Sequence, residues 1–420
     1  MDSPRIFLRQ LLDAAIASAQ SDLCLPPFVP NAVKGKTVVV GAGKASASMA
    51  RTFEQHFKGE LSGLVVTQYG YAVPCKQVEI IEAAHPSPDA ASLTAATRIL
   101  DIAQRLGEND QLICLISGGG SALLALPFEG ISLAEKQSIG AALLDGGATI
   151  SEINCVRRHL SAIKGGRLAK AAYPAKMHTL LISDVPGDAP ENIASGPSVA
   201  DDSTCAQALD ILKQYKAVLS SETQNLLVSG ASETIKSSHA CFQNNLVQLI
   251  ATPQMALEAA ALLSEQHSVD VMIFSDRLEG EARDVGVMLA EQALQVSADN
   301  HTPTVMLSGG ETTVTVNGTG KGGRNVECLL AMAIRLNGQQ NCYALAADTD
   351  GIDGKEKIAG AIITPSTLKR AQKIGLNPQA YLDNNDAHTF FTALGDSVMT
   401  GPTHTNVNDF RAVLNLSSAP

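Results

Sequence analysis

Short apolar runs of strand length alternate with helix-forming segments through most of this chain of 420 residues. In the first half, the predicted strands are Thr37–Val40, Leu64–Thr67, Val78–Ala83, Leu112–Ile116 and Thr179–Ser183. Helix-forming segments such as Ala45–His56 and Ala90–Leu106 lie between most of them. Strands and helices that alternate in this way build βα units, whose strands pair in parallel. The pattern therefore predicts an α/β fold with a mainly parallel sheet in the first half.

Two further helices and a domain boundary are predicted around this sheet. Ser3-Pro4 has the pattern of an N-cap followed by proline at the first helical position, so a helix is expected from there to about Ala19. A second helix is expected from Ser151 to Ala172. The stretch Ser203–Ser238 is polar and helical, and it predicts a boundary near residue 235 between domains 1–235 and 236–420.

The second half has its own strands and helices. Predicted helices are Gly280–Ala298 and Arg324–Leu336, and predicted strands are Leu246–Ala251, Val269–Phe274, Thr304–Leu307, Thr312–Val316, Tyr343–Ala347 and Ala361–Thr364. The segment from Glu311 to Val316 follows the preceding strand so closely that a hairpin is favoured over a helical crossover. A mixed sheet is therefore expected in the second domain.

Composition excludes several classes of protein. A net charge of −11 argues against non-specific nucleic-acid binding, which needs a basic surface. No apolar run approaches the length of a membrane span, and Met1–Arg5 has no apolar signal core. The eight cysteines are scattered without zinc-ligand spacing, and several lie in apolar runs. These features predict a cytoplasmic, reduced protein without structural zinc.

Two apolar runs lead into Ser-Gly-Gly, at Ser117–Ser121 and at Ser308–Glu311. A strand that stops at a glycine-rich turn exposes backbone N–H groups, which can surround an anion such as phosphate. A tight turn without a ligand is the alternative for either loop. Two loops of one design in the same chain favour a ligand.

The segment Gly41–Ser46 places Lys44 between a predicted strand and a helix. Its spacing matches neither a dinucleotide fingerprint, because Ser46 replaces the third glycine, nor a Walker A loop. A lysine at a helix N-terminus opposes the helix dipole, and an anionic ligand would remove that conflict. Lys44 is therefore a candidate for binding an anion.

Aspartates gather in two turns that follow strands. One is Ser183–Asp188, and the other is Asp348–Gly354, which has three aspartates in six residues. Carboxylates at the end of a strand can hold Mg²⁺ or accept a substrate proton, although Asp, Pro and Gly are also ordinary turn residues. Closely packed carboxylates repel one another unless a cation shares the site, which favours function for the second turn.

Basic residues occupy two further glycine-rich segments. In Gly320–Asn325, Lys321 and Arg324 precede a predicted helix, and arginine suits bidentate binding of carboxylate or phosphate. The segment Lys164–Arg167 has a similar pair, for which solvated side chains are favoured. His85–Asp89 predicts a rigid turn that begins the next helix.

These motifs resemble the glycerate 2-kinases of the tartrate-degradation type, whose C-terminal part is called the MOFRL domain. The resemblance spans residues 35 to 411 and rests on motifs of distinctive length and order. They are Val40–Ala45, His85–Asp89, Ile116–Leu123, Asn154–Leu168, Ser183–Asp188, Ile193–Pro197, Leu278–Ala282, Leu307–Val314, Gly322–Asn325, Thr349–Gly354 and Thr400–Asp409. The chain departs from the family at Lys321, where arginine is common, and at Asp348, where glycine is usual.

The resemblance implies a Rossmann-like N-terminal domain, a C-terminal α/β MOFRL domain and an active site in the cleft between them. It implies transfer of phosphate from ATP to D-glycerate, giving 2-phosphoglycerate and ADP, with Mg²⁺ or another divalent cation. The implied catalytic residues are Lys44, Asp184, Glu311, Arg324 and Asp350. The implied metal ligands are Asp184, Asp350 and Asp353. The residues expected to bind the cofactor and phosphate are Gly43, Ser117, Gly118, Gly119, Gly120, Ser121, Lys164, Asn325 and Asn408.

Two other functions stay open. The first is a hydroxypyruvate reductase that uses NAD(P)H, which would need the dinucleotide fold that Gly41–Ser46 does not supply. The second is a non-catalytic protein that binds a phosphorylated sugar acid, which would not explain the three aspartates before Gly354. The expected partners are D-glycerate and ATP, with no nucleic acid and no membrane, and a homodimer is one option.

Overall fold

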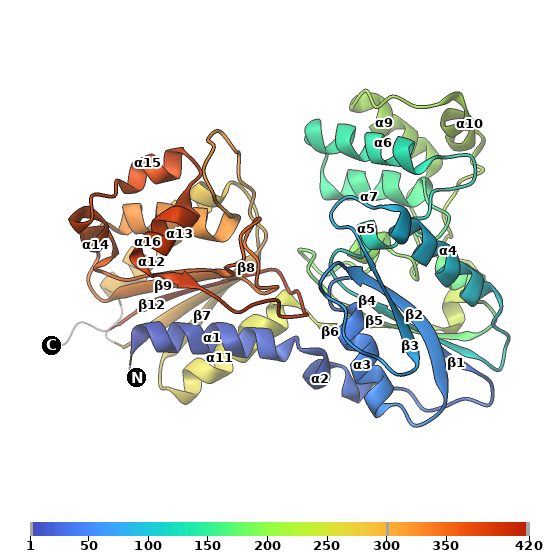
Figure 1. Ribbon diagram of the computed structural model, residues 1–420, viewed down its shortest axis with the longest axis horizontal. Coiled ribbons are helices and arrows are strands. Elements are labelled where there is room, and N and C mark those ends of the chain that lie inside the picture. The colour runs from blue at the N-terminus through green and yellow to red at the C-terminus, as the bar shows by residue number, and fades with distance from the viewer. Residues whose placement is uncertain (1–2, 300–301, 417–420) are drawn as a thin grey trace. The chain divides into compact units, whose positions relative to one another are not determined.

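The computed structural model describes residues 3–299 and 302–416, and the chain divides into two compact units (Figure 1). The parallel-sheet unit contains Ser21–Ser183 and Asp188–Ile250. The mixed-sheet unit contains Met1–Gln20, Asp184–Gly187 and Ala251–Pro420. Contacts within the chain define these units, and the sequence-based division into domains 1–235 and 236–420 stays a prediction.

A six-stranded sheet forms the centre of the parallel-sheet unit, in the order β3-β2-β1-β4-β5-β6. The strands are β1 (Thr37–Ala42), β2 (Leu61–Gln68), β3 (Val78–Ala83), β4 (Gln111–Ile116), β5 (Lys176–Ile182) and β6 (Asn245–Ala251). Neighbouring strands from β3 to β5 pair in parallel, as the alternation of strands and helices predicts. Because β1 and β4 are buried along their whole length, both read as continuous apolar runs. The strand order reverses between β1 and β4, as in doubly wound α/β folds.

Nine α-helices accompany this sheet in the described residues of the unit. They are α2 (Ser21–Cys24), α3 (Ser46–His56), α4 (Ala90–Gln104), α5 (Gly120–Leu123), α6 (Leu133–Asp145), α7 (Ile150–His159), α8 (Arg167–Ala172), α9 (Cys205–Gln214) and α10 (Ser221–Ser229). Asp89 caps α4 by accepting a hydrogen bond from the Ser92 N–H, so the segment from His85 begins this helix as predicted. Helices α6, α7, α9 and α10 form a group with its own apolar core, which includes Ile139, Val156 and Leu212.

The prediction of one helix from Ser151 to Ala172 is wrong, because a turn that contains two glycines separates two shorter helices. Helix α7 ends at His159 and α8 begins at Arg167. Between them, Gly165 and Gly166 have φ angles of +57° and +77°. A Cβ atom at Gly166 would lie 2.8 Å from Cζ of Phe242 and 3.0 Å from the Val199 carbonyl oxygen. The left-handed backbone and the close approach both require glycine here.

The mixed-sheet unit also has a six-stranded sheet, in the order β11-β10-β9-β12-β8-β7. The strands are β7 (Asp270–Leu278), β8 (Thr304–Gly310), β9 (Cys342–Asp348), β10 (Gly360–Ile363), β11 (Ser397–Val398) and β12 (Asp409–Asn415). Only β7 and β8 pair in parallel within the described part of this sheet, and the other neighbours are antiparallel. The prediction of a mixed sheet is therefore confirmed.

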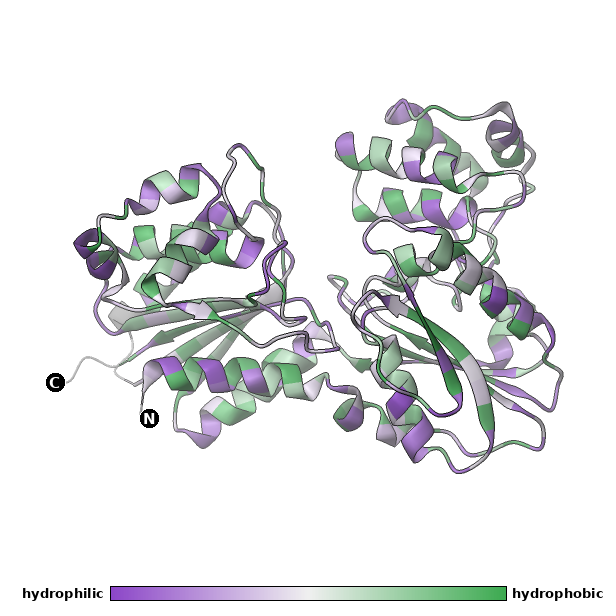
Figure 2. Cartoon of the chain, in the orientation of Figure 1, coloured by the Kyte–Doolittle hydropathy of each residue, from purple (hydrophilic) through white to green (hydrophobic). Residues whose placement is uncertain are grey.

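Helices cover both faces of this second sheet (Figure 1). They are α1 (Pro4–Ser18), α11 (Pro253–Gln266), α12 (Ala282–Asp299), α13 (Arg324–Leu336), α14 (Thr367–Lys373), α15 (Pro378–Asp383) and α16 (Ala387–Leu394). Helices α1 and α11 pack together on one face, while α12 and α13 lie on the other. Apolar residues gather on the strands and on the inner sides of the helices (Figure 2). Among the described helices, none has the length and apolar character needed to cross a membrane.

The second Ser-Gly-Gly is not a turn. Ser308, Gly309 and Gly310 continue β8, where Ser308 is paired with Arg411 and Gly310 with Leu278. The predicted hairpin and the strand Thr312–Val316 are also wrong, since only Thr313 makes a bridge, in parallel with Glu281. The two Ser-Gly-Gly segments are therefore unlike each other, because pairing with β7 extends β8 to Gly310.

We predict that Gly166→Ala destabilises the parallel-sheet unit more than Gly147→Ala does. Both glycines have positive φ, but a Cβ at Gly147 has open space whereas one at Gly166 meets Phe242. The left-handed conformation alone should cost about 1 kcal/mol, and the added clash should raise the loss at Gly166 to about 3 kcal/mol. Urea unfolding followed by circular dichroism measures both losses, and equal losses would contradict the assignment.

Candidate active site

The turns that follow β1 and β4 meet at the point where the strand order reverses. The Lys44 N–H donates to the Gly118 carbonyl oxygen at 2.8 Å, and the Ala45 N–H donates to the Ser117 hydroxyl at 2.9 Å. The Ser117 N–H in turn donates to the carbonyl oxygen of Ala42. In doubly wound sheets, ligands bind outside the carboxyl ends of the strands at such a reversal. The geometry therefore brings the two sequence motifs around Lys44 and Ser117 into one candidate site.

Two glycines allow this close approach. A Cβ atom at Gly43 would lie 2.1 Å from the Ser117 hydroxyl oxygen. At Gly119, where φ is +80°, a Cβ would lie 3.0 Å from Cδ2 of His85 and 3.5 Å from Cγ of Lys44. The Lys44 stem and the His85 ring therefore both lie against Gly119. The sequence predicted a rigid turn at His85 and gave this histidine little weight as a ligand, and nothing in its local motif indicates this contact.

The serines of this turn have their own partners. The Ser117 side chain is buried and accepts the Ala45 N–H, which makes it a support for the turn. The Ser121 hydroxyl shares a hydrogen bond of 2.9 Å with the Ser195 hydroxyl, which donates to Asn154 Oδ1. The N–H of Gly120 donates to the Ser117 carbonyl oxygen. Of the two serines in this turn, Ser121 lines an adjoining cavity and Ser117 does not.

Lys164 and Arg167 are not solvated, so that interpretation of the sequence is wrong. Lys164 is fully buried, and its Nζ donates to the carbonyl oxygens of Leu124 and Ala194 at 2.8 and 3.3 Å. Burial, followed by the charges of Lys136 and Arg157, holds the pKa of Lys164 well below its usual value. Arg167 donates to four backbone carbonyl oxygens. The turn at Gly165 and Gly166 directs these side chains inward, which a continuous helix would not do.

In the mixed-sheet unit, Arg324 forms the centre of a cluster of charges. It is the first residue of α13, and its Nε donates to both carboxylate oxygens of Asp409, at 2.8 and 3.0 Å. Its Nη2 donates to Asp348 at 2.7 Å, and its Nη1 lies 3.4 Å from Glu311. Burial alone would lower the pKa of Arg324, but the charges of Asp409, Asp348 and Glu311 raise it well above its usual value. Arg324 is therefore fixed in direction and permanently charged.

Asp409 and Arg411 belong to this cluster and were missed as site residues. Asp409 is paired with Asp348 across β12 and β9, so two carboxylates face Arg324 from neighbouring strands. Asp409 also accepts hydrogen bonds from Asn325 at 2.7 Å and from Arg411 at 2.6 Å. The available signal was Arg411, a single charge within the apolar run Phe410–Leu414. A charge in a buried strand needs a partner, and Asp409 lies two residues away.

Asp353 lies at the N-terminus of α13, where it supports the cluster. Its two oxygens accept the backbone N–H groups of Asn325 and Val326, at 3.1 and 2.9 Å. Burial is the largest cause of a raised pKa at Asp353, and the charge of Asp409 adds to it. Both oxygens are thus engaged in fixing the start of the helix that carries Arg324.

Asp184 and Asp350 lie in turns that amide groups hold in place. Asp184 follows β5, and its Oδ2 accepts from Asn406 Nδ2 at 3.0 Å, while its carbonyl oxygen accepts from Asn408 Nδ2 at 2.9 Å. The Asp350 N–H donates to Asp348, and Asp350 Oδ1 accepts the Ile352 N–H. Thr349 Oγ1 donates to the carbonyl oxygen of Asn408. Asn408 therefore connects the turn of Asp184 with the turn of Asp350.

The predicted metal ligands fit a divalent cation unequally. Both oxygens of Asp353 accept backbone N–H groups at the start of α13, whereas Asp184 accepts a hydrogen bond from the Asn406 side chain and Asp350 accepts the Ile352 N–H, so only Asp353 is tied to a helix by both oxygens. Mg²⁺ is usually held by one or two protein carboxylates together with phosphate oxygens and water, so it does not need a cage of three aspartates. Within residues 3–299 and 302–416, the one close group of three possible ligands is a different one, His159, Cys205 and Glu233. Glu233 there already binds Lys236 at 2.8 Å.

Comparison with known families assigns both halves of the chain. Residues 7–228 match a domain of unknown function (DUF4147), and residues 304–409 match the MOFRL family. D-glycerate 2-kinase of Thermotoga maritima is 38% identical over 405 residues, which cover 95% of both chains. A protein of Agrobacterium vitis with the provisional name hydroxypyruvate reductase is 48% identical, over 98% of this chain and 94% of its own.

The fold has solved counterparts. The crystal structure of glycerate kinase from Thermotoga maritima superposes with a TM-score of 0.90 at 36% identity, covering 99% of this chain and 100% of its own. A structure from Pyrococcus horikoshii superposes with a TM-score of 0.83 at 35% identity, covering 100% of both chains.

We predict that Asp409→Asn lowers the free energy of unfolding of the mixed-sheet unit by about 3 to 5 kcal/mol. The substitution leaves the buried charges of Arg324 and Arg411 without their shared counter-charge. Asp210→Asn is the matched control, since that carboxylate is exposed beside Lys213, and it should change stability by no measurable amount. Guanidinium titration measures both, and a small loss for Asp409→Asn would contradict the importance of the shared carboxylate.

Proposed function

Because this chain belongs to the glycerate 2-kinase family, we propose that it transfers the γ-phosphoryl group of ATP to the C2 hydroxyl of D-glycerate, producing 2-phosphoglycerate and ADP. The observation that carries the proposal is the similarity to glycerate kinases along nearly the whole chain, in sequence and in fold. The strand order with its reversal beside Lys44 also supports it, because this is where α/β sheets bind ligands.

In the parallel-sheet unit, we assign phosphate binding to Lys44 and to the turn from Ser117 to Ser121, including Gly118, Gly119 and Gly120. The contact of the Lys44 stem with Gly119 places the lysine beside the glycine backbone. Gly43 has no side chain to collide with Ser117, so the turn that carries Lys44 can lie against the glycine turn. A lysine ammonium neutralises phosphate charge, and backbone N–H groups add directed donors. We also assign Lys164 to phosphate binding, because it lines the cavity that adjoins Ser121.

In the mixed-sheet unit, we assign the orientation of glycerate to Arg324, Glu311 and Asp350. Arg324 is held on one side by Asp409 and Asp348, and its Nη1 faces Glu311, which is half exposed. A guanidinium held in this way offers its remaining N–H groups to a carboxylate or a migrating phosphoryl group. Asp350 or Asp184 would accept the proton of the C2 hydroxyl. Asn325, Asn408 and Asp353 position these groups through their hydrogen bonds.

We further propose that a divalent cation, normally Mg²⁺, binds at Asp184 and Asp350. When bound, Mg²⁺ neutralises charge on the phosphates and helps to hold them in line with the acceptor. The amide donors Asn406 and Asn408 fix Asp184 in place. Two carboxylates with ordered supports fit a cation that completes its shell with phosphate oxygens and water. The sequence also predicted Asp353 as a ligand, but its two bonds to backbone N–H groups support a positioning role instead.

The principal alternative is a hydroxypyruvate reductase, because relatives at 48% identity carry that provisional name. One assay separates the two activities. Purified protein with D-glycerate and Mg-ATP should release ADP and form 2-phosphoglycerate rather than 3-phosphoglycerate. The same protein with NADH and hydroxypyruvate should show no oxidation of NADH, and NADH turnover without ADP release would refute the kinase. A protein that only binds a phosphorylated sugar acid would show neither reaction.

Cytoplasmic location and the option of a homodimer stay predictions from the sequence.

We predict that Lys44→Ala lowers kcat/KM for D-glycerate phosphorylation by about 10²-fold or more, because it removes a charge that opposes the phosphate. Lys58→Ala is the control, since that lysine is exposed beyond the end of α3. Steady-state kinetics with both substrates varied measures the effect. Unchanged kcat/KM in the Lys44 variant would remove this residue from the mechanism.

We also predict that Arg324→Lys, which keeps the charge, loses activity nearly as severely, by about 10²-fold in kcat/KM. A lysine cannot bind Asp409 and Asp348 together and still present N–H groups toward Glu311. Lys321→Arg serves as the comparison, since Lys321 is exposed and pairs with Glu356. Full activity of Arg324→Lys would show that only the charge is needed.

A further inference from the structure

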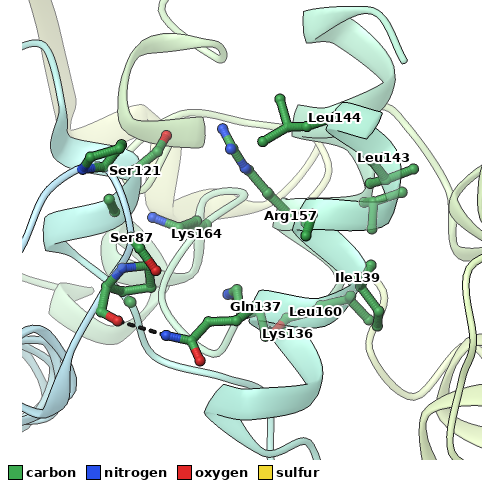
Figure 3. A pocket seen from close by; sticks show the side chains of 17 residues that line it. Ser87, Ser121, Lys136, Gln137, Ile139, Leu143, Leu144, Arg157, Leu160 and Lys164 are labelled. Carbon is green, nitrogen blue, oxygen red and sulfur yellow. Dashed lines mark hydrogen bonds between the residues drawn. The ribbon is translucent and has the colours of Figure 1, made fainter. Parts of the chain in front are cut away.

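A cavity of about 290 Å³ lies next to Ser121 in the parallel-sheet unit (Figure 3). Its walls come from the loop Pro86–Pro88, from α5, and from the facing sides of α6 and α7. We call it the basic pocket, because Lys136, Arg157 and Lys164 all line it. It begins at the glycine turn to which phosphate binding was assigned above, although no motif in the sequence indicated a pocket here.

The three cations of the basic pocket have no carboxylate partner among its lining residues, which include neither Asp nor Glu in the described structure. Lys164 donates only to carbonyl oxygens, and Lys136 donates to the Leu160 carbonyl oxygen at 3.3 Å. Arg157 and Lys164 point into the cavity, and Arg157 forms no hydrogen bond or ion pair with the described residues (Figure 3). A fully buried lysine and two half-buried cations with no carboxylate beside them favour an anionic ligand.

The charges in the basic pocket also oppose one another. Burial first, and then the charges of Arg157 and Arg167, lower the pKa of Lys136 to about 7. Burial likewise lowers the pKa of Arg157. A ligand with several negative charges would relieve both the repulsion and the loss of hydration. A single carboxylate would relieve only part of it.

The rest of the basic pocket is aliphatic. Ile139, Leu143 and Leu144 on α6 face Val156 and Leu160 on or next to α7. Leu144 is 61% exposed, so its side chain is open to solvent at the edge of the cavity. Apolar surface next to several cations fits a ligand that has a flat apolar part and a polyanionic part. D-glycerate has no apolar part, so this wall would give it nothing to contact.

We propose that the basic pocket binds the adenine nucleotide, with the base against the aliphatic side of α6 and the phosphates at Arg157, Lys136 and Lys164. This inference rests on the proposed function and adds to it the place and the residues that bind ATP. The phosphates then extend past Ser121 toward the glycine turn and Lys44, which lie in the same unit. Helices α6 and α7 of the helical group would thereby supply one side of the nucleotide site.

The test is calorimetric titration of the full-length protein with Mg-ADP and, separately, with pyrophosphate. Arg157→Gln should weaken ADP binding by about tenfold or more, because it removes a charged donor to phosphate. Leu144→Ser should weaken ADP binding several-fold and leave pyrophosphate binding unchanged, because it alters only the wall for the base. Arg105→Gln and Leu262→Ser are the matched controls, the latter on an exposed leucine of α11 with nearly the same exposure, 59%. Neither control should alter ADP binding.

The outcomes separate the pocket from the enzyme activity. If the wild type and both pocket variants bind ADP equally well, the basic pocket is not the nucleotide site, and the kinase proposal is unaffected. If both variants bind ADP more weakly than the wild type, but the wild type forms no 2-phosphoglycerate, the nucleotide site is supported and the kinase proposal is refuted. Pyrophosphate lacks the adenine base, so equal affinity of the wild type for pyrophosphate and ADP would refute the proposed contact between the base and α6. Circular dichroism of each variant confirms that it is folded.

Discussion

The carboxylate of Asp409 joins three parts of the mixed-sheet unit that lie far apart in the sequence. It begins β12, accepts hydrogen bonds from Arg324 and Asn325 at the start of α13, and binds Arg411 two residues along its own strand. Through Arg324 the contact continues to Asp348 on β9. A buried carboxylate is tolerated only with such partners, because an unpaired buried charge costs several kcal/mol. The interaction that fixes the sheet and the helix therefore also fixes the guanidinium to which substrate binding is assigned.

The sequence predicted the elements whose signal is local. Strands buried on both sides are continuous apolar runs, so β1 and β4 could be found, and their alternation with helices gave a parallel sheet. Lys44 could be selected because a lysine at a helix start conflicts with the dipole. Arg324 could be selected because an arginine between glycines and a helix suits bidentate binding of carboxylate or phosphate. Such arguments need only neighbouring residues, and their outcome does not depend on how distant segments pair.

The errors arose where distant segments decide the result. Ser308–Gly310 looks like a turn, but pairing with β7 extends the strand to Gly310. Lys164 looks solvated in a continuous helix, but α7 ends at His159 and the turn before α8 places the Lys164 Nζ against buried carbonyl oxygens. Asp409 gains its importance from Arg324, which lies 85 positions away. The cations of the basic pocket come from α6, α7 and the turn beyond, and only their packing reveals that they share a space without a carboxylate.

The division of the chain between the two units has a consequence for its synthesis. The parallel-sheet unit consists almost entirely of the continuous stretch from Ser21 to Ile250, whereas the mixed-sheet unit needs α1 together with the segment that begins at Ala251. On the ribosome, the first of these can assemble while the remainder is still being made. Helix α1 must wait, because β9, β12 and α11, against which it packs, emerge later. During that interval its residues that are buried in the folded protein, including Phe7, Leu8 and Leu11, present an uncovered apolar face to solvent.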